Sequence, residues 1–155
     1  MRRLKTESPK TRSPKAKSPK NWSAKTPRPR TPSPKTRRKK ALTGLDRART
    51  ATETASDKQA SDIILLDLRP ACDFTDYFVI CSADSAPQTE AIASGVAQAM
   101  SDTGARLHHK EGASDSGWVL LDFSDVVVHI FSPEARRLYQ LDKVWAEAKT
   151  IVRIQ

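Results

Sequence analysis

Four short and mostly apolar blocks recur in the second part of the chain, and each has the length of a β-strand. They are SDIILLDL (61–68), DYFVICSA (76–83), GWVLLDF (117–123) and VVVHIF (126–131). The last two flank Ser124 and Asp125, whose residue types favour a turn, so they predict a β-hairpin. A fifth block, RLHHKEG (106–112), is more polar, and we expect it to form a strand at the edge of the sheet.

Two further segments carry the longer apolar spacing of helices. The first covers about residues 45–60, and its inward positions are alanines: Ala48, Ala51 and Ala55. The second begins at Ser85, an N-cap residue type, with Gln88 at the capping-box position. Its apolar stripe consists of Ile92, Val96 and Met100. We expect this helix to end at Gly104, because glycine favours the left-handed conformation that terminates helices.

A last helix is predicted after Ser132, which precedes a proline and a glutamate. Its inward face would consist of Leu138, Leu141 and Trp145. The resulting order of strands and helices predicts an α/β fold: a single small domain over residues 45–150, with a mixed five-stranded sheet flanked by helices.

The first forty residues differ from the rest in composition. They hold sixteen Lys and Arg, one acid and seven of the ten prolines, whereas residues 41–155 hold eleven Lys and Arg against seventeen acids. We expect residues 1–44 to be a disordered basic tail, because they lack the apolar residues of a core. Its repeated Ser-Pro-Lys favours weak, salt-dependent contact with nucleic acid. A mitochondrial transit peptide is disfavoured by the prolines, and a solvated extension of little function stays open.

Cysteine usage and hydropathy bear on the compartment. Cys72 and Cys81 do not form a disulfide framework, and Cys81 lies within an apolar run where we expect a buried thiol. No stretch has the length of a membrane span, and the N-terminus lacks the apolar core of a signal peptide. We therefore expect a cytoplasmic protein without a membrane partner.

Catalytic motifs are not evident. The sequence contains no glycine-rich phosphate loop, no Gly-x-Ser-x-Gly elbow and no Asp-x-Asp pair, and its cysteines lack zinc-ligand spacing. Adjacent strand residues point to opposite faces, so His108 and His109 do not readily share a metal. A lone strand histidine such as His129 is more often structural than catalytic. We expect no catalytic residue, no metal site and no cofactor.

One strand has an unusual outer face. Alternation places Val119, Leu121 and Phe123 on one side and an aromatic, an aliphatic and an acid on the other: Trp118, Leu120 and Asp122. The second set has the composition of a binding surface. A helix that covers it would explain the same pattern, and the strand alone favours that interpretation somewhat. The pairing register decides whether His129 faces the same side.

The residue types of the segments within 57–145, and the order of these segments, resemble the ribosomal silencing factor family (RsfS/Iojap). The matching segments are DKQASDIILLDL, DYFVICSADSAPQ, GWVLLDFSDVVVHIF and PEARRLYQLDKVW. The resemblance implies a nucleotidyltransferase-like core without the catalytic carboxylates, which agrees with the missing Asp-x-Asp. It implies a non-enzymatic translation repressor that binds the large ribosomal subunit through its fourteenth protein and prevents the small subunit from joining when nutrients are short. A role in large-subunit assembly is also implied.

The resemblance also suggests residues. Trp118, Leu120 and Asp122 match the family's docking strand, and Glu111, Tyr77 and Tyr139 are weaker candidates for partner binding. Two helix arginines, Arg136 and Arg137, are candidates for ribosomal RNA phosphates, although such residues are more often solvated.

The tail would add a contact with ribosomal RNA, and the protein would be a monomer or a weak homodimer. The alternatives are a nucleotidyltransferase-like enzyme acting on nucleotides or RNA, and a DNA-binding protein led by its basic tail.

Overall fold

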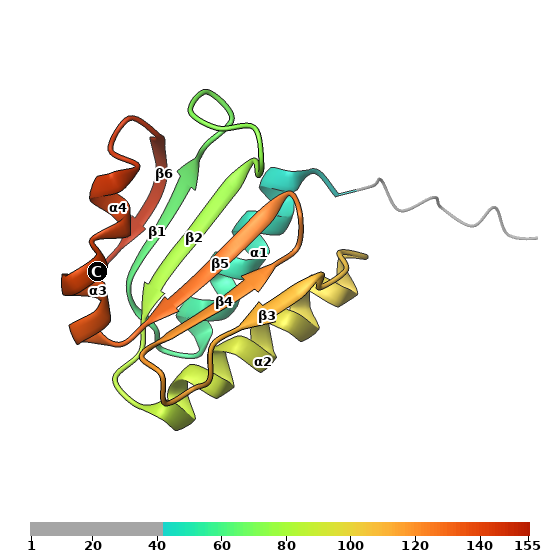
Figure 1. The fold of residues 1–155 in the computed structure, drawn as a ribbon. Helices are drawn as coiled ribbons and strands as arrows, with labels where there is room; N and C mark the ends of the chain where they lie inside the picture. Colours follow the sequence, from blue (N-terminus) through green and yellow to red (C-terminus); the bar gives the residue numbers. More distant parts are fainter. Residues whose placement is uncertain (1–41) are drawn as a thin grey trace, which may run out of the picture. The chain divides into compact units, whose positions relative to one another are not determined.

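A six-stranded sheet organises the residues described by the computed structural model, 42–155 (Figure 1). Of the tail predicted over residues 1–44, residues 1–41 lie outside the described residues. The elements are α1 (Gly44–Asp57), β1 (Ser61–Asp67), β2 (Tyr77–Ser82), α2 (Ala86–Asp102), β3 (His109–Glu111), β4 (Trp118–Asp122), β5 (Val126–Phe131), α3 (Pro133–Tyr139), α4 (Leu141–Val144) and β6 (Lys149–Ile154).

The strand order across the sheet is β3-β4-β5-β2-β1-β6. Strands β2 and β5 pair in parallel, and all other neighbours pair antiparallel. The α/β class, the mixed sheet and the hairpin of β4 and β5 are therefore confirmed, as is the edge position of the polar strand β3.

The sheet has six strands where the sequence predicts five. The additional strand, β6, pairs antiparallel with β1 and closes the sheet at the edge opposite β3. Its burial is low at both ends and only partial in the middle, at Ile151 and Val152. The segment KTIVRI therefore shows neither a buried apolar run nor strict alternation, which are the two signals of a strand.

Helices α1 and α2 cover one face of the sheet (Figure 1). Thr43 and Asp46 form a capping box that begins α1, and the buried alanines of this helix are Ala48, Ala51 and Ala55, as predicted. Their small side chains let α1 pack closely on the sheet. Arg47 Nη1 lies 2.8 Å from Asp125 Oδ2, so the predicted turn residue Asp125 also ties α1 to the β4–β5 hairpin.

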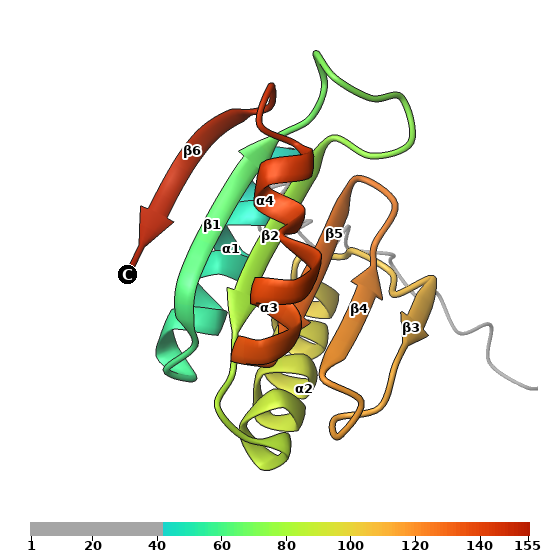
Figure 2. The ribbon, with the colours of Figure 1, turned by 60° about the vertical axis from the view of Figure 1, so that its left-hand side comes forward.

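The opposite face carries α3 and α4, and here the prediction of one continuous helix is wrong (Figure 2). Gln140 adopts a left-handed conformation with φ 43° and ψ 44°, so α3 ends at Tyr139 and a new turn begins. This change of direction leaves Leu138 exposed (74%), whereas Leu141 and Trp145 still pack against the sheet.

The loop that leads into β4 depends on glycine at position 112. Gly112 has φ +83°, and a Cβ placed there would overlap the backbone carbonyl of Trp118. Gly104 has a similar φ of +84°, but a Cβ there would meet no atom within 4 Å.

We expect Gly112→Ala to lower the free energy of unfolding by about 3 kcal/mol or more, from strain plus overlap, and Gly104→Ala by only ~1 kcal/mol. Urea unfolding of both variants measures the difference, and equal losses would contradict this account of the loop.

Candidate functional site

Helices α3 and α4 cover only part of their face of the sheet and leave a groove beside β4. The groove has a volume of about 390 Å³. Its largest apolar lining residues are Phe74, Phe78, Trp118, Leu120, Leu141 and Trp145. Phe74 lies in the loop between β1 and β2 and is 64% exposed, which is unusual for so large an apolar side chain. The helix predicted as one explanation of the β4 pattern is therefore present, but it does not close the surface.

Trp118 is held at one end of the groove by other rings. Its ring centroid lies 4.8 Å from that of Phe131 on β5 and 4.9 Å from that of Tyr139 on α3. Trp118 is only partly buried, and Tyr139 is half exposed. The indole is thus fixed by packing while part of it stays accessible, which is the arrangement of an interface anchor.

His129 lies on the same face as Trp118, because Leu120 is the partner of His129 across the β4–β5 pair. The Trp118 indole Nε1–H donates a hydrogen bond to His129 Nδ1 at 3.3 Å. Since the indole nitrogen is only a donor, Nδ1 is the acceptor and the proton of the neutral ring sits on Nε2. Burial, with a smaller effect from the Arg136 charge, lowers the pKa of His129 to about 4. His129 is therefore a neutral residue that orients the Trp118 side chain.

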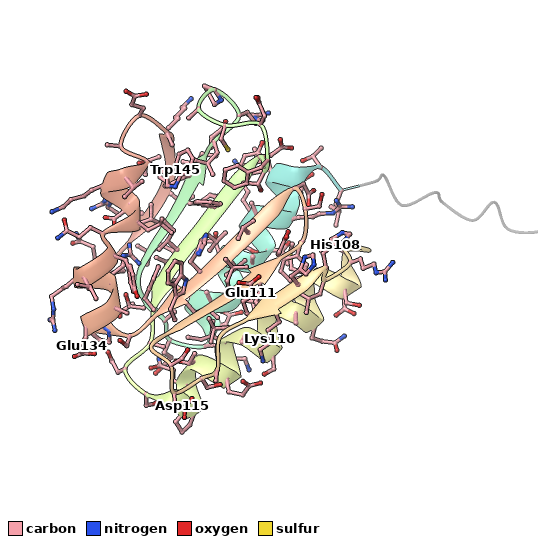
Figure 3. The ribbon with its side chains drawn as sticks, in the orientation of Figure 1. His108, Lys110, Glu111, Asp115, Glu134 and Trp145 are labelled. Atoms are coloured by element: carbon pink, nitrogen blue, oxygen red, sulfur yellow. The ribbon has the colours of Figure 1, made fainter. Side chains whose placement is uncertain are left out.

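Two carboxylates border the groove. Asp122 accepts a hydrogen bond from the Ser124 backbone N–H at 2.7 Å, and its other oxygen lies 3.6 Å from His109 Nδ1. Glu111 is exposed on β3, directly opposite Leu120 in the strand pair (Figure 3). An apolar centre with charged residues at its edge is the usual anatomy of a protein-binding surface.

The structure brings five of the six predicted binding residues to one region: Trp118, Leu120, Asp122, Glu111 and Tyr139. The sixth, Tyr77, does not join them. It is 3% exposed and belongs to the cluster on the opposite face, beneath α1. The groove also contains Phe74 and Phe78, which the sequence did not indicate as binding residues. No periodic pattern marks either side chain for binding.

Within residues 42–155, no three His, Cys, Asp or Glu side chains converge as a metal site would require. No helix in this part of the chain combines the length and the hydropathy needed to cross a membrane. Cys81 is fully buried, as predicted, and burial raises the pKa of its thiol to about 12.

The fold and the groove together define a small α/β domain with an accessible aromatic face. Residues 41–155 match the family described as "Ribosomal silencing factor during starvation". The chain belongs to this ribosomal silencing factor family.

Individual similar proteins support this family membership. "Ribosomal silencing factor RsfS" of Bacillus subtilis is 38% identical over 98 residues, which are 63% of this chain and 83% of that protein. "Mitochondrial assembly of ribosomal large subunit protein 1" of Mus musculus is 31% identical over 94 residues, 57% of this chain and 40% of that protein. A crystal structure of a Chromobacterium violaceum protein is 28% identical, with a TM-score of 0.65, and the match covers 68% of this chain and 88% of that one.

The His129–Trp118 contact makes a prediction about pH. Because the pKa of His129 is depressed in the folded state, its neutral form stabilises the fold above the unfolded pKa of 6.5, and this contribution is lost as the pH falls towards 4. His129→Asn keeps an acceptor near the indole and does not titrate. When the pH is lowered from 7 to 4.5, the free energy of unfolding of the variant should fall by about 2 kcal/mol less than that of wild type. Urea unfolding at both pH values measures this.

The control is His108→Asn, at an exposed position outside the groove (Figure 3). It should follow the wild-type dependence on pH. A His129→Asn variant that also follows wild type would show that His129 is not a buried neutral group.

Proposed function

We propose that this protein binds the large ribosomal subunit through the aromatic groove and prevents the small subunit from joining it. Occupation of the inter-subunit surface lowers translation when nutrients are short. The observation that carries the proposal is the accessible aromatic face beside β4, in a chain of the ribosomal silencing factor family. The mechanism is steric, so it needs no catalytic group.

The proposed partner is the fourteenth protein of the large subunit, as the family resemblance implies. Residues 41–155 carry more acids than bases, seventeen against eleven, and an acidic domain is suited to a basic ribosomal protein. Asp122 and Glu111 place negative charge at the edge of the groove. In this account Trp118 and Leu120 supply apolar anchoring, and Asp122 meets a basic group of the partner.

The structure suggests additional anchors beyond those predicted. The Phe74 ring lies 5.9 Å from Trp145 and 6.0 Å from Phe78, so these three aromatics form a second cluster in the groove. Trp118 and Tyr139 form the first. We propose that a partner segment contacts both clusters, because interface energy concentrates on large aromatic side chains that become fully desolvated.

A role in large-subunit assembly is a second consequence of the same binding. The name of the mouse relative refers to assembly of the mitochondrial ribosomal large subunit. A protein that occupies the joining face also keeps an immature subunit out of translation. For this chain we propose action in the cytoplasm.

The competing proposal, a nucleotidyltransferase-like enzyme, would require carboxylates that converge on a divalent metal. In the described part of the chain, no such group of side chains occurs. The family favours regulation by binding, and we therefore propose a non-enzymatic function.

Replacement of Trp118 tests the docking face. Trp118→Ala should weaken binding to isolated large subunits by about 2–4 kcal/mol, roughly 30- to 1000-fold, because it removes a central aromatic anchor. Sedimentation of both subunits with the protein should show wild type travelling with the large subunit and reducing the joined-ribosome peak. The variant should restore joining.

Two further variants make this test specific. Phe74→Ala alters a side chain of the same groove that is 64% exposed, and it should also weaken binding with only a small loss of stability. Leu42→Ala changes an exposed apolar residue before α1, outside the groove, and should bind like wild type. If Trp118→Ala and Phe74→Ala both bind as tightly as wild type, the proposed docking face is contradicted. If wild type does not bind the large subunit, the proposed function is contradicted.

A further inference from the structure

A second hollow lies on the other side of α3 and α4 from the aromatic groove. It has a volume of about 440 Å³ and is bordered by α3, α4, β1 and β6. Figure 2 shows α3 and α4 as a ridge over the sheet, with β1 and β6 on one side and β5 and β4 on the other. The groove and this hollow therefore open on the same face of the sheet.

The hollow is rich in positive charge. Four cationic side chains line it: Arg136, Arg137, Lys143 and Arg153. They are more than a third of the eleven Lys and Arg in residues 41–155, a part of the chain with seventeen acids. The acidic side chains that line it are Asp62 and Asp142. We call this hollow the basic pocket.

Most of these cations are not neutralised by a close partner. Lys143 and Arg153 are exposed and form no ion pair within residues 42–155. Arg137 lies 3.5 Å from Glu134, but both side chains are about three-quarters exposed, and such a pair holds its members weakly. These three side chains are free to turn towards an anion.

Arg136 supplies a fixed charge at the pocket. Its side chain is only 10% exposed, and its Nε lies 3.4 Å from Asp142 Oδ1. Its Nη1 is buried without a hydrogen-bond partner in the described residues. A buried guanidinium with a single carboxylate contact is incompletely compensated, so an anion held nearby by the flexible cations would improve its environment.

We propose that the basic pocket binds a backbone phosphate of ribosomal RNA beside the docking groove. Lys and Arg bind RNA phosphates through charge, without reading the bases, and the four cations suit that chemistry. The four cations come from three separate elements and are not arranged around a glycine-rich loop. A site for a small free phosphate compound would favour such a loop. The inference rests on the proposed function, because a subunit that covers the groove would bring its RNA within reach of the same face.

The test uses the full-length chain with Lys143→Ala and Arg153→Ala combined. Its control combines Arg49→Ala and Arg106→Ala, which remove the same charge at exposed positions outside the pocket and without an ion pair in the described part of the chain. Binding to isolated large subunits is measured over a range of salt concentrations. The pocket variant should bind more weakly, and its slope of log affinity against log salt should be shallower by about 1, which corresponds to the loss of one phosphate contact.

The control should keep the wild-type slope. Unchanged slopes, or an equal decrease in both double variants, would overturn the proposal, because general electrostatics would then explain the binding. If wild type does not bind large subunits at all, the proposed function fails first, and the pocket is judged by NMR titration. Shifts of the Lys143 and Arg153 amides with a short single-stranded RNA support the pocket. Shifts with inorganic pyrophosphate only, or with neither probe, overturn it.

Discussion

The pairing register of β4 with β5 is the constraint on which the proposed binding face depends. It places Trp118 opposite Phe131 and Leu120 opposite His129, so an aromatic, an aliphatic and a buried imidazole share one side of the sheet. A shift of one residue would turn Trp118 towards α1 and α2 and expose Val119 and Leu121. The hydrogen bond between the Trp118 indole and His129 then fixes the orientation of the anchor, which lowers the entropy lost on binding.

The break at Gln140 has a comparable influence on the other half of this face. A straight helix would have directed one continuous apolar stripe at the sheet, with Leu138 buried in it. The left-handed residue instead exposes Leu138 and sends Leu141 and Trp145 into the groove. Lys143, two positions after Leu141, lines the basic pocket. A single short ridge thus separates the apolar surface proposed to bind protein from the basic surface proposed to bind an anion.

Periodicity predicted most of the fold, because the buried runs of β1, β2, β4 and β5 and the stripe of α2 are strong signals. It also predicted the outer face of β4, where alternation is strict. It missed β6, whose partial burial leaves no pattern, and the break at Gln140, because a left-handed glutamine has no local signature. The family resemblance suggested Tyr77 for partner binding, but this side chain lies on the opposite face, and a strand buried on both faces does not show in its sequence which face a residue takes. Phe74 lies in a loop, where periodicity says nothing.

The most direct test of the central claim is a cryo-electron microscopy map of the full-length chain bound to isolated large subunits. The account predicts that the face carrying β4, α3 and α4 contacts the subunit at its joining surface, with Trp118 buried against protein and α1 and α2 turned to solvent. A complex in which α1 and α2 contact the subunit, or in which the protein lies away from the joining surface, would contradict it.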